Sequence, residues 1–163
     1  MKNEATSAVQ MLVPDGKTIQ TLQVVKDTPV DAPIEIVWES ILEELGSAAM
    51  APNGTSMAMK IEPWPGGRWY RDTGEKTGHL WGHVQVIKPP KLLEISGPLF
   101  MSYPAISHVQ YRLIEDGGKT LMKFAHRAIG LIDPEHAKGV HTGWQKITDG
   151  IVAIAKRRLA AGK

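Results

Sequence analysis

Apolar side chains recur every three to five residues through the C-terminal part of the chain, which is the spacing of one face of an α-helix. Asp133 is a suitable N-cap, and Pro134 suits the first helical position. The pattern predicts a long helix within residues 133–163, of roughly 26 residues or about 39 Å. Such a helix must pack along something large and apolar. Its stripe consists of Val140, Trp144, Ile147, Ile151, Ile154 and Leu159.

A period of two, typical of β-strands, replaces the helical spacing in the middle of the chain. On the third of these strands, Leu80, Val84 and Val86 are expected to share one face. Short turns separate the strands, so neighbours in sequence are expected to pair antiparallel. The predicted strands span residues 57–62, 68–72, 79–87, 91–97, 106–115 and 120–127.

The N-terminal part predicts one more strand and a helix. Residues 18–26 are rich in β-branched side chains and are expected to form the strand. Residues 33–45 carry an apolar stripe at helical spacing, which Gly46 ends. A short helical turn could follow at residues 47–50. Residues 1–16 are mostly polar and are expected to be a flexible arm before a single domain over residues 17–163.

The order of these elements indicates an α+β fold. We expect a curved antiparallel sheet of six to seven strands wrapped around the long C-terminal helix, with one or two short helices after the first strand. We expect one helix to leave space on the concave side of such a sheet. That space is either packed shut by large side chains or remains a cavity.

Composition narrows the function further. The chain has no cysteine, which excludes disulfides, thiolate catalysis and cysteine-based zinc sites. Its net charge of +2 is small and its basic residues are scattered, which argues against nucleic-acid binding. No apolar run approaches the roughly 18 residues of a membrane span, and the N-terminus has no apolar signal-peptide core. The sequence therefore predicts a cytoplasmic protein without membrane insertion.

Five short motifs, in order along the chain, carry a family resemblance. They are V-D-A-P with V-W at residues 30–38, E-P-W-P-G-G-R-W at 62–69, G-H-V with K-P-P-K-L at 82–92, T-L with a later histidine at 120–126, and H-T-G-W at 141–144. Together they resemble the START-like, Bet v 1-like (SRPBCC) superfamily. Within it, the chain is most similar to bacterial single-domain members of the family named for the activator of Hsp90 ATPase.

The resemblance implies a helix-grip fold with a deep pocket between the sheet and the C-terminal helix. Members of the superfamily bind hydrophobic small molecules, and some are cyclases or cochaperones. The chain departs from the eukaryotic cochaperone, because it lacks that protein's separate N-terminal domain and its N-x-N-N-W-H-W motif. This departure argues against a direct contact with Hsp90.

The histidine spacings do not predict a metal site. His79 and His83 would lie about 13 Å apart on a strand, and His136 and His141 would point in different directions on a helix. We therefore expect neither a metal nor a cofactor. His126 is expected to face inward, either as a buried hydrogen-bonded side chain or as a polar anchor or general base in the pocket.

Aromatic and methionine side chains on the inward faces are either core or the wall of an adaptable apolar pocket. Arg71 would share the inward face of Trp69 and could hold a ligand carboxylate, or it is a solvated charge at the sheet rim. The candidate pocket residues are Trp38, Met57, Met59, Trp69, Arg71, Tyr111, Met122, Phe124, His126, Val140 and Trp144. His136 and His141 are expected beside Val140 and Trp144 at the pocket lip.

Three functions remain open from the sequence. The first is a carrier or sensor that binds a hydrophobic small molecule without covalent chemistry. The second is a cyclase or hydrolase in which His126 gives acid–base help with Arg71 or Tyr111. The third is a cochaperone-like interaction protein. An exposed sheet edge could also pair in a homodimer.

Overall fold

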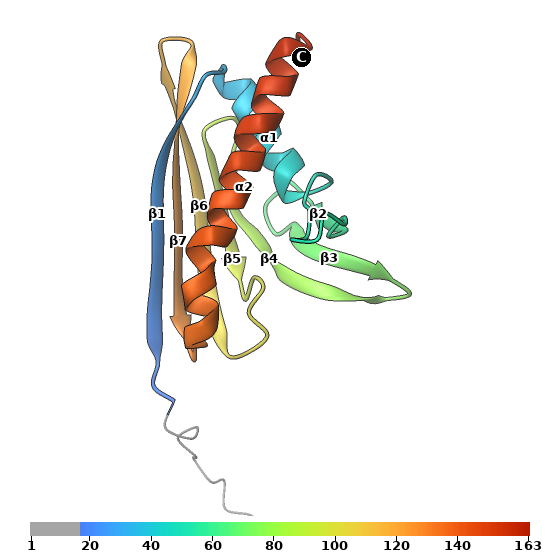
Figure 1. Cartoon of the computed structure of the whole chain (residues 1–163), viewed down its shortest axis with the longest axis vertical. Coiled ribbons are helices and arrows are strands. Elements are labelled where there is room, and N and C mark those ends of the chain that lie inside the picture. The colour runs from blue at the N-terminus through green and yellow to red at the C-terminus, as the bar shows by residue number, and fades with distance from the viewer. Residues whose placement is uncertain (1–16) are drawn as a thin grey trace, which may run out of the picture.

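The computed structural model describes residues 17–163, and the arm expected at residues 1–16 lies outside them. Seven strands and two helices follow in the order that the sequence predicts: one strand, a helix, six strands and the long C-terminal helix (Figure 1). The strands are β1 (Gln20–Val30), β2 (Met59–Ile61), β3 (Arg68–Gly74), β4 (Thr77–Lys88), β5 (Leu92–Gly97), β6 (Ala105–Asp116) and β7 (Lys119–Gly130). The helices are α1 (Ile34–Leu45) and α2 (Pro134–Ala160).

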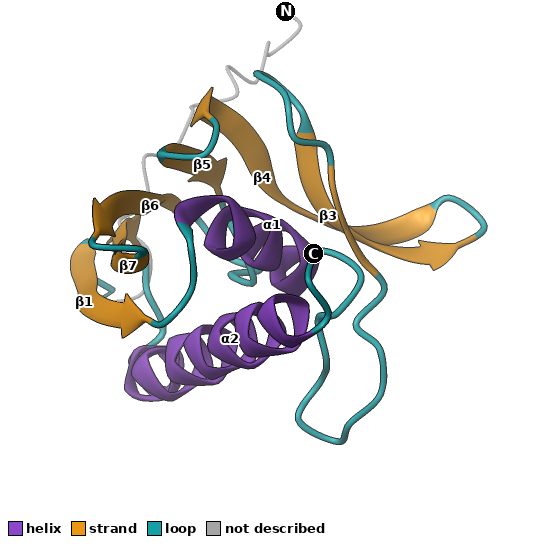
Figure 2. Cartoon of the chain, turned by 90° about the horizontal axis from the view of Figure 1, so that it is seen from above, coloured by secondary structure: helices purple, strands orange, loops and turns teal. Residues whose placement is uncertain are grey.

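All seven strands form one antiparallel sheet in the order β1-β7-β6-β5-β4-β3-β2. The sheet curves around both helices, which lie side by side on its concave face (Figure 2). This arrangement confirms the predicted α+β helix-grip fold. Within residues 17–163, no helix is long and apolar enough to cross a membrane.

Helix α2 has the length that its apolar stripe predicts, with 27 residues. The Asp133 side chain accepts a hydrogen bond from the Glu135 backbone N–H at 2.8 Å, which caps the first turn. Val140, Trp144, Ile151 and Ile154 of the stripe are buried. The expectation for Leu159 is wrong, because the last turn of α2 lies at the end of the molecule and leaves this side chain 46% exposed (Figure 1).

Helix α1 fills the part of the concave face that α2 leaves open. It buries the predicted stripe of Ile34, Val37, Trp38, Ile41 and Leu45. The short helical turn expected at residues 47–50 does not form. Instead the chain runs as a loop from Gly46, and Met50 makes an isolated antiparallel bridge with Ser56.

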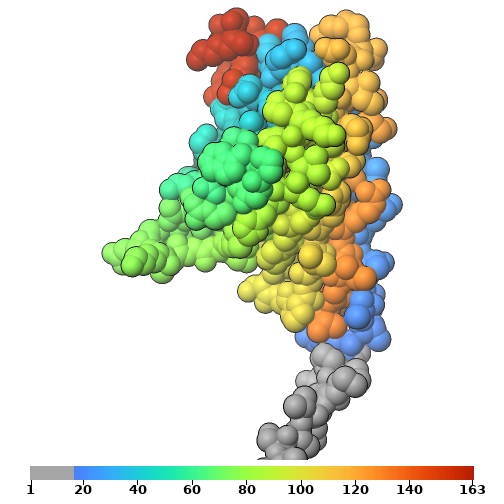
Figure 3. All heavy atoms as spheres, turned by 180° about the vertical axis from the view of Figure 1, so that it is seen from behind, coloured from blue at the N-terminus to red at the C-terminus, as the bar shows by residue number. Residues whose placement is uncertain are grey.

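Strand β1 extends four residues beyond its predicted end, to Val30. Pro29 lies within it, which is tolerated because β1 is an edge strand and needs hydrogen bonds on one side only. The outer face of the sheet, seen in Figure 3, bears the exposed Ile106 and Ile129, which are opposite each other on β6 and β7. The edge strands of the sheet are β1 and β2, and a homodimer through an exposed sheet edge remains a prediction.

A β-bulge changes the pattern of faces in β4. Trp69 of β3 is opposite Gly82, but the next residue, Tyr70, is opposite Leu80, so Trp81 is the extra residue. The alternation of β4 is therefore interrupted between Val84 and Leu80. Leu80 is 41% exposed, and the expectation that it shares the buried face of Val84 is wrong.

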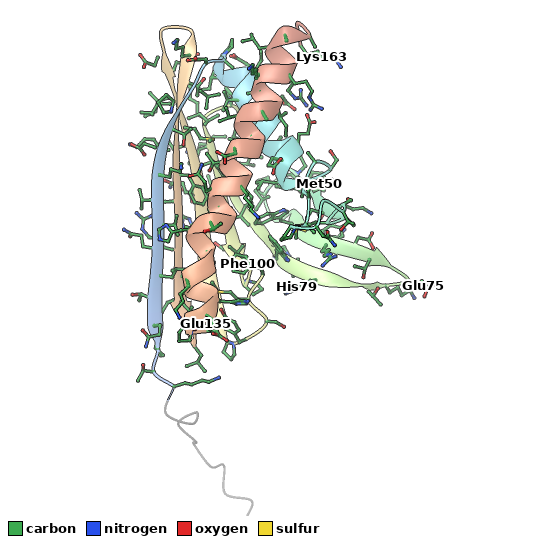
Figure 4. All side chains as sticks on the ribbon, viewed as in Figure 1. Met50, Glu75, His79, Phe100, Glu135 and Lys163 are labelled. Carbon is green, nitrogen blue, oxygen red and sulfur yellow. The ribbon has the colours of Figure 1, made fainter. Side chains whose placement is uncertain are left out.

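Arg71 lies on β3 where the β3–β4 hairpin begins to leave the helices (Figure 4). Trp69 is buried, but Arg71 lies beyond the bulge and is exposed. Here the β3–β4 hairpin projects away from the helices toward its tip at Glu75 (Figure 4). Arg71 is thus an exposed charge at the rim of the sheet, the second of the two predicted alternatives, although Met59 opposite it on β2 is buried.

Candidate functional site

The concave side of the fold keeps a cleft of about 670 Å³ beside the N-terminal half of α2. The loop after α1 forms one wall, and Trp81 of the bulge and Phe100 of the β5–β6 connection contribute to the other. Figure 4 shows Met50 and Phe100 on the same side of α2. The lining residues are Glu44, Ala48, Met50, Ala51, Pro52, Gly54, Met57, Trp81, Phe100, Glu135, His136, Gly139, Val140, Gly143, Trp144, Lys146, Ile147 and Gly150.

Two glycines, Gly139 and Gly143, leave room for this cleft on α2. A β-carbon added at Gly139 or Gly143 would meet no atom within 4 Å. Glycine costs about 1 kcal/mol relative to alanine inside a helix, and no packing requirement offsets that cost here. Gly139 and Gly143 therefore give a ligand direct access to the helix backbone.

Aromatic rings in edge-to-face contact line the cleft. The ring of Trp81 lies 5.0 Å from Trp69 and 5.9 Å from Phe100, measured between centroids. Phe100 in turn lies 6.0 Å from the ring of His136. These contacts join the buried core to the cleft and hold the wall in a fixed shape.

Trp81, which lines the cleft, also carries a donor without a partner. Its indole Nε1 is buried and is the one buried side-chain nitrogen or oxygen among residues 17–163 without a hydrogen-bond partner. A buried donor without a partner costs about 1–3 kcal/mol.

At the end of the cleft near the start of α2, His136 is held by a hydrogen bond. Its Nδ1 lies 2.9 Å from the hydroxyl oxygen of Tyr103. Burial raises the pKa of the Tyr103 hydroxyl, so this group stays protonated at neutral pH. The pair is exposed on its outer side, and it fixes the orientation of the imidazole at this end.

Glu44 lies at the other end of the cleft, on the last turn of α1. Burial raises the pKa of its carboxyl group to about 7, and the negative charge of Glu43 adds to the effect. The carboxyl group lies against α2 at Gly150, where an added β-carbon would be 2.5 Å from Oε1. The absence of a side chain at Gly150 therefore makes room for Glu44.

His126 is in the core beneath the cleft and has no exposed surface. Its Nδ1 accepts a hydrogen bond of 2.9 Å from Nε1 of Trp144, so the ring proton is on Nε2, which lies 3.0 Å from Oγ of Ser107. Burial lowers the pKa of His126 to about 4. Both nitrogens are thus occupied, and the ring is neutral at pH 7.

Comparison with known families shows which family this chain belongs to. Residues 31–156 match the model of the family described as "Activator of Hsp90 ATPase homolog 1-like protein". The chain belongs to this family. The matched range runs from the residues just before α1 into the last turns of α2, so the family's common part includes every element that lines the cleft. No curated protein matches the sequence significantly.

Solved structures with low sequence identity share the fold of this family member. An uncharacterised protein from Rhizobium leguminosarum has a TM-score of 0.66 at 16% identity, covering 86% of this chain and 97% of its own. CalU16 from Micromonospora echinospora has a TM-score of 0.58 at 21% identity, covering 85% and 79%. A protein of unknown function from Staphylococcus aureus has a TM-score of 0.61 at 13% identity, covering 87% and 98%. At these identities the comparison shows the fold alone.

The structure divides the candidate pocket residues into two groups. Met57, Val140 and Trp144 line the cleft, together with His136 from the expected lip. His141 does not, and lies in a separate depression beside β1. Met59 borders another depression near the end of α1, and Arg71 is on the exposed hairpin. The remaining candidates, Trp38, Trp69, Tyr111, Met122, Phe124 and His126, are buried outside the cleft lining.

Several lining residues were not among the sequence candidates. Trp81 faces the cleft only because of the β4 bulge, and Phe100 lies in a connection without periodicity. In the sequence, Glu44 looks like any other polar residue outside the apolar stripe of α1. The clearest signal in the sequence was the spacing of Gly139 and Gly143, four residues apart on one face of the helix. Among residues 17–163, no group of three acidic or histidine side chains could hold a metal ion.

Proposed function

We propose that this protein binds a hydrophobic small molecule in the cleft, as a carrier or sensor without covalent chemistry. The volume of about 670 Å³ is within the range of small-molecule sites, and the lining combines aromatic rings, methionines and open helix backbone. The observation that carries the proposal is the open space beside Gly139 and Gly143 on a wall that is largely apolar. A ligand there would pack its apolar body against the helix backbone and the rings of Trp81 and Phe100.

The same geometry argues against the hypothesis of an enzyme in which His126 acts as the general base. A general base must reach the proton that it removes, but His126 has no exposed surface and both of its nitrogens have partners. Arg71, its expected helper, is on the projecting hairpin, and Tyr111 is buried. The cleft supplies shape and orientation, which suits binding.

A cochaperone-like role is the second candidate, favoured by the family to which the chain belongs. It would use the surface of the protein and would not need an empty cleft. The two candidates therefore respond differently to a side chain that fills the cleft.

The experiment fills the cleft from α2. Gly143→Leu would place a side chain where a β-carbon meets nothing, and Ala153→Leu adds apolar bulk to an exposed position of the same helix as the control. Native mass spectrometry of freshly purified protein tests for a retained small molecule. Thermal shift and tryptophan fluorescence with 1-naphthalenemethanol test for binding.

We expect wild type and Ala153→Leu to bind and Gly143→Leu to lose at least about tenfold in affinity, the equivalent of 1.4 kcal/mol. Equal binding by both variants would place the ligand elsewhere. Copurification with Hsp90 that persists in Gly143→Leu, without small-molecule binding by wild type, would favour the cochaperone role.

A further inference from the structure

The carboxyl group of Glu44 is in an unusual environment for an acidic side chain at the end of a helix. It is half-buried between α1 and α2 and lines the apolar cleft. No cationic side chain pairs with it among residues 17–163, because the nearby Arg157 and Arg158 bind Glu43 instead. Glu44 is therefore a desolvated acid whose favourable partner is not part of the folded chain.

The groups around Glu44 do not supply that partner. Glu43 on α1 adds a like charge. Burial raises the pKa of the Tyr111 hydroxyl on β6, and the charge of nearby Glu44 adds to the effect. On α2, Lys146 is one turn before Gly150, but it is exposed and does not pair with Glu44. The loop at residues 47–57 has no ionisable side chain.

The aromatic side chains that line the cleft also favour a positive charge on the ligand. Aromatic faces attract organic cations, and Trp81, Phe100 and Trp144 all line the same space. Glu44 and His136 are at opposite ends, since Gly150 and His136 are separated by about 21 Å along the helix axis at 1.5 Å per residue. The cleft thus has Glu44 at one end, His136 and Glu135 at the other, and a largely apolar middle.

We propose that Glu44 is the recognition group of the cleft and that the ligand is a hydrophobic molecule with a protonated amine at one end. The ammonium group would pair with the Glu44 carboxylate beside Gly150, and the apolar body would extend along the glycines of α2 toward Trp81 and Phe100. The pairing returns to Glu44 the counter-charge that it lacks in the free protein. This inference rests on the proposed function, because it uses the same cleft.

The test compares two probes of the same shape, 1-naphthalenemethylamine and 1-naphthalenemethanol, by isothermal titration calorimetry at pH 8. We expect the amine to bind wild type about tenfold more tightly than the alcohol. Glu44→Gln should remove this preference, so that the amine and the alcohol bind this variant with affinities that agree within about twofold. Glu39→Gln, the same change at an exposed position of α1, should keep the preference.

The outcomes separate the two proposals. If the alcohol binds in the cleft but the amine binds no better, or if Glu44→Gln keeps the preference, the role of Glu44 is overturned and the binding function stands. If neither probe binds wild type, the binding function fails and the role of Glu44 fails with it.

Wild-type protein alone gives a second test, which holds even if Glu44→Gln does not fold. The carboxyl group is protonated below its raised pKa of about 7, whereas the amine probe stays charged. The preference for the amine should therefore fall severalfold between pH 8 and pH 5.5. A preference that is constant over this range would overturn the inference.

Discussion

Nε1 of Trp144 donates a hydrogen bond of 2.9 Å to Nδ1 of His126, and this bond joins α2 to β7 through the core. On its other side the imidazole meets Ser107 of the neighbouring β6 at 3.0 Å. One side chain thus links the helix to two strands in a fully satisfied buried network. Such a network orients Trp144 beneath the cleft, which makes His126 a structural residue of the site's floor.

This network predicts how stability depends on pH. Burial lowers the pKa of His126 from 6.5 to about 4, so the unfolded chain takes up a proton between these values and the folded chain does not. The free energy of unfolding should fall as the pH is lowered from about 6.5 toward 4, by up to about 3 kcal/mol from this residue. Urea denaturation of wild type and His126→Gln at pH 7 and pH 5 measures the difference. An equal decrease in both proteins would show that His126 is not responsible.

The sequence predicts the fold well because most of its elements have a strong period. The stripe from Val140 to Ile154 and the alternation of Val109, Tyr111 and Leu113 each match the buried face in the structure. Periodicity fails where an extra residue breaks it, as at Trp81, and where a hairpin leaves the core, as at Arg71. Neither event has a local signal in the residue types.

The candidate site is harder to predict than the core, for a physical reason. Alternation identifies residues that face inward, but Tyr111 and Phe124 pack against each other at 5.0 Å and close the space between them. The cleft forms where side chains are missing, at Gly139 and Gly143, and where irregular segments bring in Trp81 and Phe100. An inward-facing residue is therefore a core residue unless something small lies opposite it.

Substitutions at Gly139 of α2 should raise stability when the new side chain is small and weaken ligand binding when it is large. Gly139→Ala should raise the free energy of unfolding by about 0.5–1 kcal/mol, because alanine favours the helix and its β-carbon meets nothing. Urea denaturation at pH 7 measures this gain. A larger side chain at the same position, as in Gly139→Leu, should instead weaken probe binding. If Gly139→Ala destabilises the protein, the space beside the helix is not open in solution.

Substitution of the buried Trp69 should have a large effect on the free energy of unfolding. Its indole Nε1 donates a hydrogen bond of 2.7 Å to the backbone oxygen of Leu45, at the end of α1 where helical carbonyls lack partners. Trp69→Phe removes this bond and some packing volume, and should cost about 2–3 kcal/mol of unfolding free energy. Trp64→Phe, at a residue that is 54% exposed, should change it by less than about 0.5 kcal/mol. Similar losses in both variants would contradict the structural role of the Leu45 bond.

The contact between Glu44 and Gly150 leads to a prediction for the pKa of the Glu44 carboxyl group. Gly150→Ala would put a β-carbon 2.5 Å from the carboxyl group, and because this group is the free end of a flexible side chain, it should move toward solvent. Its pKa should then fall from about 7 toward the ordinary value of 4.5. A ¹³C NMR titration of the Glu44 carboxyl carbon, assigned by comparison with Glu44→Gln, measures the shift. Gly143→Ala is the matched control, because its β-carbon meets nothing and should leave the pKa of Glu44 near 7. A raised pKa that survives in Gly150→Ala would mean that the wall of α2 does not cause it.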